Sequence, residues 1–395
     1  MKKIIALLLC VILCLGMFSG CGDATHTADA DEEIKIVTTI FPIYDWTMNM
    51  IGDEAENYDV TMLIDNGVDM HSYQATTADM VTIHTCDVLI YVGGESDLWI
   101  EDLLSSTTNT DMIVINLVDV LGDVVVFEEL VEGMEATEHS HDTEEECTDE
   151  ECEEDHDHEE ECTDECCEED HDHDEECTDE ECEEDHDHDH DEECTDEECE
   201  EDHDHDDEEC EDECCEDEID EHVWLSLTNA ETICSVIADT LASLDSANAS
   251  TYSSNLDSYA GQLQSLDSEY AEMVSTATGD TLLFADRFPF RYFVEDYNIN
   301  YYAAFAGCSS ETEASFETVA FLAGKVDELG LEKIIVVEGV AHKIAETVIS
   351  ATANQNQTIL SVNAMETITS ADIANGVTYI SVMQENLEVF KDALN

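Results

Sequence analysis

Short apolar segments alternate with amphipathic ones in two separate parts of the chain. Segments rich in Val, Ile and Leu predict buried strands, and segments with helical spacing lie between them. The predicted strands are 34–39, 59–64, 87–92 and 112–116 in the first part, and 281–285, 299–304, 333–337 and 358–362 in the second. The predicted helices are 41–51, 77–86, 98–104, 228–244, 292–297, 316–329, 341–352 and a last one from 377 or 379 to 394. This alternation predicts an α/β fold with two lobes, each a four-stranded, mostly parallel sheet flanked by helices.

A long amphipathic helix is predicted between the two parts, over about 247–277. Its apolar positions recur at intervals of four and three residues, at Tyr252, Leu256, Tyr259, Leu263, Leu266, Tyr270 and Met273. Such a helix is roughly 45 Å long, which exceeds the diameter of a small domain. A coiled-coil dimer helix is one interpretation. Its place between two α/β lobes favours a spine against which both lobes pack.

The segment 138–221 interrupts this pattern, with 54 acidic residues and no Lys or Arg. It repeats the unit EECTDEECEEDHDH, and a segment this polar is expected to be disordered without a ligand. Because Cys and His recur in phase, we predict metal binding by the segment, with an inert acidic linker as the alternative. The candidate ligands are Cys147, Cys152, His156, His158, Cys162, His171, His173, Cys177, Cys182, His186, His188, Cys194, Cys199, His203 and His205. Disulfides are the chemical alternative if the segment lies in an oxidising exterior.

The charge and the N-terminus restrict where the protein works. The formal net charge of −94 excludes ordinary nucleic-acid binding, which needs Lys and Arg against phosphate. Lys2 and Lys3 precede the apolar segment 4–17, and Cys21 follows a small residue, as in a bacterial lipoprotein signal. We therefore expect lipidation at Cys21 and a lipid anchor in the membrane. A plain secretory signal is the alternative.

Several motifs resemble those of one protein family. They are 37–45 (VTTIFPIYD), 69–74 (DMHSYQ), 86–93 (CDVLIYVG), 221–226 (EHVWLS) and 384–387 (QENL). They resemble the metal-binding receptor lipoproteins of bacterial ABC importers for zinc and manganese, the cluster A-I substrate-binding proteins. The acidic, His-rich insertion is typical of the zinc-specific branch of that family, whereas the many Cys residues in it are unusual.

The resemblance implies a metal ion in a cleft between the lobes, with His71 and His222 as ligands. Arg287 stands where the family has a third histidine, and an arginine cannot bind a cation. Asp286 is our first choice as the replacement ligand, and Glu338, which ends a predicted strand, is another candidate. Arg287 could pair with Asp286 and orient it, or form a salt bridge without a role in metal binding.

Other single residues give weaker signals. The family's late aspartate falls near Asn363, whose amide oxygen is a weak ligand for zinc. Cys86, Cys234 and Cys308 lie outside the repeat segment, and isolated cysteines of this kind are interpreted as small buried side chains.

The functional expectation is an extracellular, lipid-anchored, monomeric receptor that binds zinc and delivers it to an ABC permease in the cytoplasmic membrane. Thiolate and imidazole favour Zn²⁺, while Mn²⁺ or Fe²⁺ stays possible if carboxylates complete the cleft site. A surface zinc buffer without a transport role is the alternative. The sequence has neither an H-E-x-x-H helix nor a nucleophile elbow, so we expect no enzymatic activity. The expected parts are a signal peptide (1–20), a tether (21–33), the first lobe (34–137 and 222–246), the insertion (138–221), the spine (247–278) and the second lobe (279–395).

Overall fold

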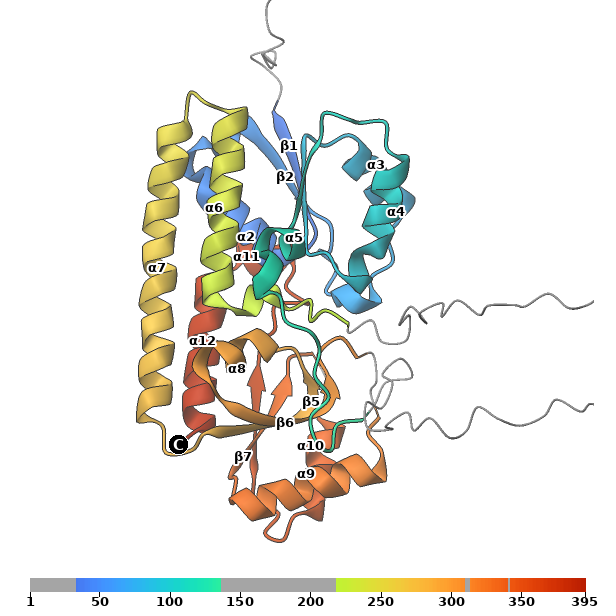
Figure 1. Cartoon of the computed structure of the whole chain (residues 1–395), viewed down its shortest axis with the longest axis vertical. Helices are drawn as coiled ribbons and strands as arrows, with labels where there is room; N and C mark the ends of the chain where they lie inside the picture. The colour runs from blue at the N-terminus through green and yellow to red at the C-terminus, as the bar shows by residue number, and fades with distance from the viewer. Residues whose placement is uncertain (1–32, 136–217, 310–312, 340–341) are drawn as a thin grey trace, which may run out of the picture. The chain divides into compact units, whose positions relative to one another are not determined.

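Two parallel four-stranded sheets form the framework of the protein (Figure 1). The computed structural model describes residues 33–135, 218–309, 313–339 and 342–395. The first sheet has the order β2-β1-β3-β4 and the second has the order β6-β5-β7-β8, with every strand pair parallel. The predicted fold class, two α/β lobes joined by a long helix, is confirmed. The predicted signal segment and residues 138–217 of the predicted insertion lie outside the described residues.

The strands follow the apolar segments of the sequence closely. Those of the first sheet are β1 (Ile34–Thr38), β2 (Tyr58–Met62), β3 (Val88–Tyr91) and β4 (Ile113–Asn116). Those of the second are β5 (Thr281–Phe288), β6 (Asn300–Ala306), β7 (Lys333–Val337) and β8 (Thr358–Val362). Because all strands of a parallel sheet end at one edge, the loops that follow them gather there, where ligands bind in α/β folds.

The helices cover the sheets and connect the strands. In the first lobe they are α2 (Phe41–Ile51), α3 (Thr77–His84), α4 (Leu98–Ser106), α5 (Leu117–Leu121) and α6 (Leu227–Leu244). The second lobe has α8 (Arg291–Tyr297), α9 (Phe316–Leu329), α10 (Lys343–Ala351), α11 (Ser370–Ala374) and α12 (Tyr379–Ala393). The sequence did not predict α5 and α11, because five residues are too few to show a helical period.

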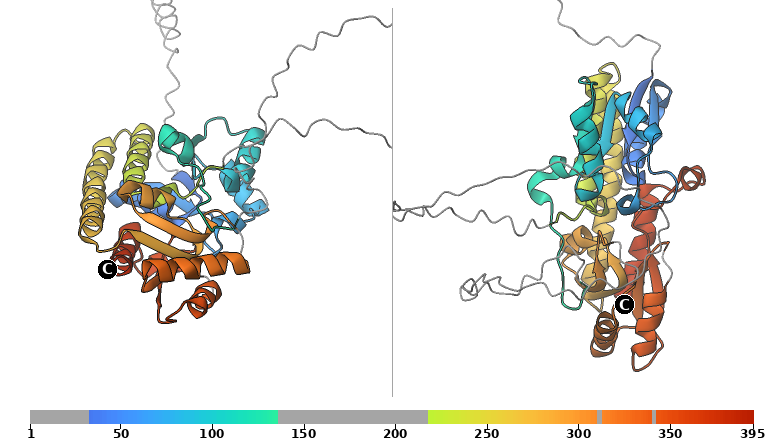
Figure 2. Two further views of the ribbon diagram at one scale, coloured as in Figure 1. Left: turned by 60° about the horizontal axis from the view of Figure 1, so that its bottom comes forward. Right: turned by 90° about the vertical axis from the view of Figure 1, so that its right-hand side faces the viewer.

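The long helix α7 (Ala249–Thr276) packs against helices of both lobes, as the spine interpretation predicted. It runs beside α6 and contacts α2, α8 and α12 (Figures 1 and 2). Its tyrosines reach into both lobes. The hydroxyl of Tyr252 lies 2.7 Å from that of Tyr58, and Tyr270 donates a 2.6 Å hydrogen bond to the carbonyl of Met383 on α12.

The chain leaves the first lobe and returns to it at one point. Phe127 and Ile219 form an antiparallel bridge, and the Glu128 amide donates a 2.8 Å hydrogen bond to the Glu218 carbonyl. Residues 218–221 were assigned to the insertion by their composition, yet they belong to this bridge and to the site beside it. Asp220 and Glu221 are buried, and their charges are accommodated because histidines lie against them.

None of the described helices combines the length and the apolar character that crossing a bilayer requires.

Candidate metal site

The structure brings His71 and His222 together, although 151 residues separate them in the sequence. His71 lies in a short 3₁₀ turn (Met70–Ser72) in the loop after β2, and His222 directly precedes another such turn (Val223–Leu225). Their Nε2 atoms are 3.2 Å apart. Their side chains are 5% and 0% exposed, so the two imidazoles meet in a nearly dry interior.

Glu366 supplies a third potential ligand atom from the second lobe. Its Oε1 lies 3.0 Å from Nε2 of His222, and its side chain is 1% exposed. Glu366 follows β8, at the carboxyl edge of the second sheet. Sequence reasoning placed the late acidic ligand near Asn363 and missed Glu366. An acidic residue soon after the last predicted strand was the available signal.

Each histidine has a carboxylate against its other ring nitrogen. Asp220 Oδ1 lies 3.0 Å from Nδ1 of His222, and Glu221 Oε2 lies 3.3 Å from Nδ1 of His71. The Ser96 hydroxyl is also 2.8 Å from that Nδ1. An acceptor at Nδ1 favours the tautomer that carries its proton there, which leaves the Nε2 lone pair for a metal ion.

Arg287 connects the loops of the two lobes. Its guanidinium forms ion pairs with Asp69, two residues before His71, and with Oε2 of Glu366. The sequence suggested a pairing with Asp286, but the guanidinium of Arg287 pairs with Asp69 and Glu366 instead. It thereby holds the second oxygen of Glu366 while Oε1 faces His222.

The two other sequence candidates are not among the atoms that converge on the histidines. Asp286 accepts hydrogen bonds from the amides of Arg287 (2.9 Å) and Val337 (3.1 Å), so both of its oxygens are occupied by backbone. Glu338 accepts a 2.7 Å hydrogen bond from the Ala364 amide. In the described part of the chain, neither residue belongs to a group of side chains close enough to hold one ion.

Two such groups do occur, and both include His71. One consists of His71, His222 and Cys308, and the other of Asp69, His71 and Glu366; within each, the ligand atoms lie within 4.8 Å of one another. Cys308 was interpreted as a structural residue from the sequence. The structure places its thiol beside the two histidines.

Burial and neighbouring charges shift the ionisation of these groups strongly. Burial acts to lower the pKa of His222, but Asp220, Cys308 and Glu366 outweigh it and raise that pKa well above the usual value. Burial acts to raise the pKa of Glu366, but His222 and Arg287 hold it well below its ordinary range. Burial, followed by the charge of Glu366, raises the pKa of Glu338 to about 7. A negatively charged Glu366 therefore faces His222 in the absence of an ion.

Buried hydrogen bonds fix the loops that carry the site. The indole of Trp224 donates to the Ala364 carbonyl (2.7 Å), and the Tyr379 hydroxyl donates to the Trp224 carbonyl (2.7 Å). The Asn386 side chain on α12 bonds both the amide and the carbonyl of Asn363, at 2.8 Å each. The segment after His222 and the loop before Glu366 are thereby held together.

The repeat-segment ligands and the lipidation residue fall elsewhere. The fifteen Cys and His candidates from Cys147 to His205, and Cys21, lie outside the described residues. Their predicted roles stay predictions.

Comparison with known proteins gives consistent results. The chain is 27% identical over 391 residues to the zinc-binding lipoprotein AdcA of Streptococcus pneumoniae, covering 99% of this chain and 61% of AdcA. It is 23% identical over 387 residues to the high-affinity zinc uptake system protein ZnuA of Bacillus subtilis, covering 97% and 96%. The chain thus spans about three fifths of AdcA and nearly the whole of that ZnuA.

Solved structures share the fold. The Zn(II)-bound ZnuA-like domain of Streptococcus pneumoniae AdcA superposes with a TM-score of 0.59 at 21% identity, covering 92% of this chain and 99% of that domain. The periplasmic zinc-binding protein TroA of Treponema pallidum gives 0.59 at 16% identity, covering 92% and 99%. The family model described as zinc-uptake complex component A, periplasmic (ZnuA) matches residues 36–393. This chain therefore belongs to the ZnuA family, which confirms the resemblance found in its sequence motifs.

Proposed function

We propose that this protein is a zinc receptor that holds its cargo ion between His71, His222 and Glu366. The observation that carries the proposal is that Nε2 of His222 lies 3.2 Å from Nε2 of His71 and 3.0 Å from Oε1 of Glu366, with all three side chains at most 5% exposed. Both named relatives are zinc proteins by their descriptions, and their fold is the same.

The spacing of these atoms suits zinc. Zinc bonds of about 2.0–2.1 Å in tetrahedral geometry place neighbouring ligand atoms about 3.3–3.4 Å apart. The two separations given above, 3.2 and 3.0 Å, are slightly shorter. Binding of an ion therefore requires only a small outward movement of these side chains. Without an ion, the contacts among the three side chains hold them in position.

The origin of the ligands suggests how the ion is released. His71 belongs to the first lobe and Glu366 to the second, and Arg287 pairs with acidic residues of both lobes. A separation of the lobes would therefore split the ligand set and weaken ion binding. We infer that docking on an ABC permease produces this separation and that the ion then passes to the permease.

The repeat segment and the N-terminus complete the proposal. Cys21 is the lipid anchor that keeps the receptor on the extracellular face of the membrane. The repeats collect ions and, because the chain re-enters the fold at Asp220 beside His222, present them to the site at high effective concentration.

The site is tested by titration calorimetry with zinc on a chain that lacks residues 142–215 and keeps the Phe127–Ile219 bridge. We expect one tightly bound ion, and loss of that ion when His71 and His222 are both replaced by alanine. Tight binding that survives the double substitution would refute the proposed ligands. Transport is tested by radioactive zinc uptake into cells that carry the full-length protein or its His222→Ala variant, and equal uptake would argue against delivery to a permease.

A second candidate function is a surface zinc buffer. The twelve cysteines and eleven histidines between residues 139 and 215 favour it, because they exceed what one transport site needs. Growth of a deletion strain in the presence of a zinc chelator separates the two functions. Poor growth that is restored by added zinc supports a receptor, whereas normal growth supports a buffer.

A further inference from the structure

We propose that Cys308 is the fourth zinc ligand and binds the ion as a thiolate. This inference rests on the proposed zinc site and adds a ligand to it. Its first support is geometric, because the Cys308 Sγ and a ring nitrogen of each of His71 and His222 lie within 4.8 Å of one another. Imidazole nitrogen and thiolate sulfur are both established zinc ligands and occur together in zinc sites.

The local backbone delivers the thiol to the histidines. Cys308 follows β6 after a single residue, Gly307, whose backbone is pressed against the imidazole of His222. A Cβ on Gly307 would lie 3.0 Å from Cε1 of His222 and 2.9 Å from the Phe288 carbonyl oxygen. Only a glycine permits this close approach without displacement of the ring.

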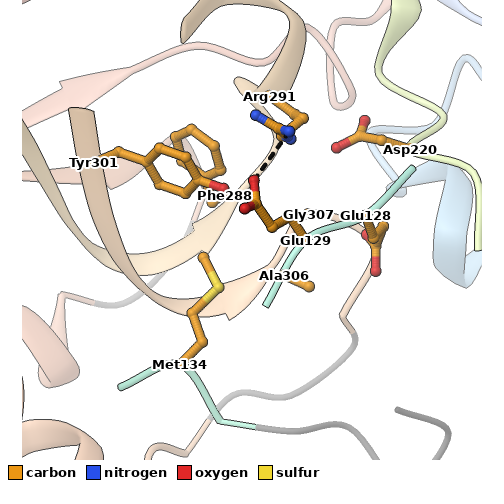
Figure 3. A pocket seen from close by; sticks show the side chains of 9 residues that line it. All are labelled: Glu128, Glu129, Met134, Asp220, Phe288, Arg291, Tyr301, Ala306 and Gly307. Atoms are coloured by element: carbon orange, nitrogen blue, oxygen red, sulfur yellow. Dashed lines mark ion pairs between the residues drawn. The ribbon is translucent and has the colours of Figure 1, made fainter. Parts of the chain in front are cut away.

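Glu128 fixes the position of Cys308 from the other side. Its Oε1 accepts a 2.7 Å hydrogen bond from the Cys308 amide. Glu128 lines a small pocket together with Asp220 and Gly307 (Figure 3). Cys308 is therefore anchored through its backbone to the segment that precedes the insertion, while its side chain is directed to the site.

The other residues near the histidines leave one ligand position for Cys308. Arg287 has no lone pair to offer, and its guanidinium is bound to Asp69 and Glu366. Asp69 is also engaged by the amide of His71, at 2.9 Å. In the described part of the chain, Cys308 shares one group of possible ligands with His71 and His222, and Glu366 shares another with His71 and Asp69. A set of His71, His222, Glu366 and Cys308 joins these two groups and leaves out Asp69.

The chemistry of binding balances in charge and protons. Zn²⁺ replaces the proton of the Cys308 thiol and the proton on Nε2 of His222, the Zn–S and Zn–N bonds form, and both protons leave to water. The two negative charges of the thiolate and the Glu366 carboxylate then match the two positive charges of the ion. A ligand set that neutralises the ion is favourable in a site this dry. A thiolate also selects zinc over manganese, which prefers oxygen ligands.

The inference is tested with cobalt(II), a coloured substitute for zinc, in the full-length chain with its twelve cysteines from 147 to 215 replaced by serine. We expect an intense near-ultraviolet charge-transfer band from a cobalt–thiolate bond, and visible bands of a four-coordinate ion. Cys308→Ser should abolish the charge-transfer band, keep visible bands and lower zinc affinity at least tenfold. Cys234→Ser is the matched control, because Cys234 is a buried free cysteine on α6, and should leave the spectrum unchanged.

The outcomes separate this inference from the proposed function. Suppose that the parent chain shows visible bands that depend on His222 but no charge-transfer band. This result overturns the role of Cys308 and leaves the proposed zinc site intact. A charge-transfer band that persists in Cys308→Ser overturns it too. Spectra that are unaffected by His222→Ala contradict the zinc site itself. Because the parent chain already gives a decisive spectrum, the test does not depend on the folding of the serine variant.

Discussion

Replacement of Glu366 by glutamine should weaken zinc binding about 100-fold. The substitution keeps the shape of the side chain but removes the negative charge of an oxygen that lies 3.0 Å from Nε2 of His222 in a 1% exposed position. A buried charge-assisted contact is worth about 1.5–3 kcal/mol. A loss of about 2.7 kcal/mol corresponds to two factors of ten in affinity.

The loss can be measured as zinc-induced stabilisation of the chain that lacks residues 142–215. At a free zinc concentration about 100 times the dissociation constant, the ion stabilises the parent chain by about 2.7 kcal/mol. At that same zinc concentration, the weakened Glu366→Gln variant should gain only about 0.4 kcal/mol. Each variant is compared with its own zinc-free form in urea unfolding, so a change in intrinsic stability does not enter the result.

Glu338→Gln is the matched control. Glu338 is also a buried carboxyl in a loop of the second lobe, but it bonds the Ala364 amide and stands outside the converging ligand atoms. Its substitution should change zinc affinity less than about threefold, since the carboxyl already holds a proton part of the time with its pKa raised to about 7 by burial and by Glu366. Equal losses in the two variants, or no loss in Glu366→Gln, would refute the assignment of Glu366.

Three further substitutions test other parts of the structure. Asp220→Asn should lower zinc affinity about 10–100-fold by calorimetry, because the partner that orients His222 at 3.0 Å loses its charge; unchanged affinity would contradict that role. Burial raises the pKa of Asp45 from 3.8 to about 6, so the folded protein holds this proton more tightly than the unfolded chain. The stability of the parent relative to Asp45→Asn should therefore fall by up to about 3 kcal/mol between pH 4 and pH 6 and stay level above, and a flat difference in urea unfolding across this range would count against it. Tyr270→Phe should lower the free energy of unfolding by about 1 kcal/mol through loss of the bond to Met383, with an unchanged denaturant slope; a variant as stable as the parent would show that this contact adds nothing.

The fold was predictable because its signals are local. The strands β7 and β8 and the helix α9 have the limits that the apolar pattern predicts, and α7 shows its buried face in the spacing of its tyrosines. The strand β5 extends three residues beyond the predicted end, since Asp286 and Arg287 interrupt the apolar run while pairing with β6 resumes at Arg287 after a register shift.

The candidate site was predictable only in part, because its residues come from loops that are distant in sequence. His71 and His222 lie in motifs that can be read locally. Glu366 and Cys308 carry no motif, and only the meeting of the ends of β8 and β6 with the histidines brings them into view. Both carboxylate oxygens of Asp286 accept hydrogen bonds from backbone amides, those of Arg287 and Val337, which no local pattern in the sequence indicates.

The bridge between Phe127 and Ile219 has a consequence for how the protein can change during evolution. The bridge closes a loop of about 90 residues between Glu128 and Glu218. Any segment inserted between these two residues therefore begins and ends at the same bridge. One more 15-residue repeat, even one that forms no structure, would raise the entropic cost of closing this loop by only about 0.1 kcal/mol. Repeats can therefore be duplicated or lost almost without effect on stability. The proposed metal-collecting capacity of the repeats and the affinity of the proposed zinc site are then free to be selected independently, one by recombination between repeats and the other by point mutation.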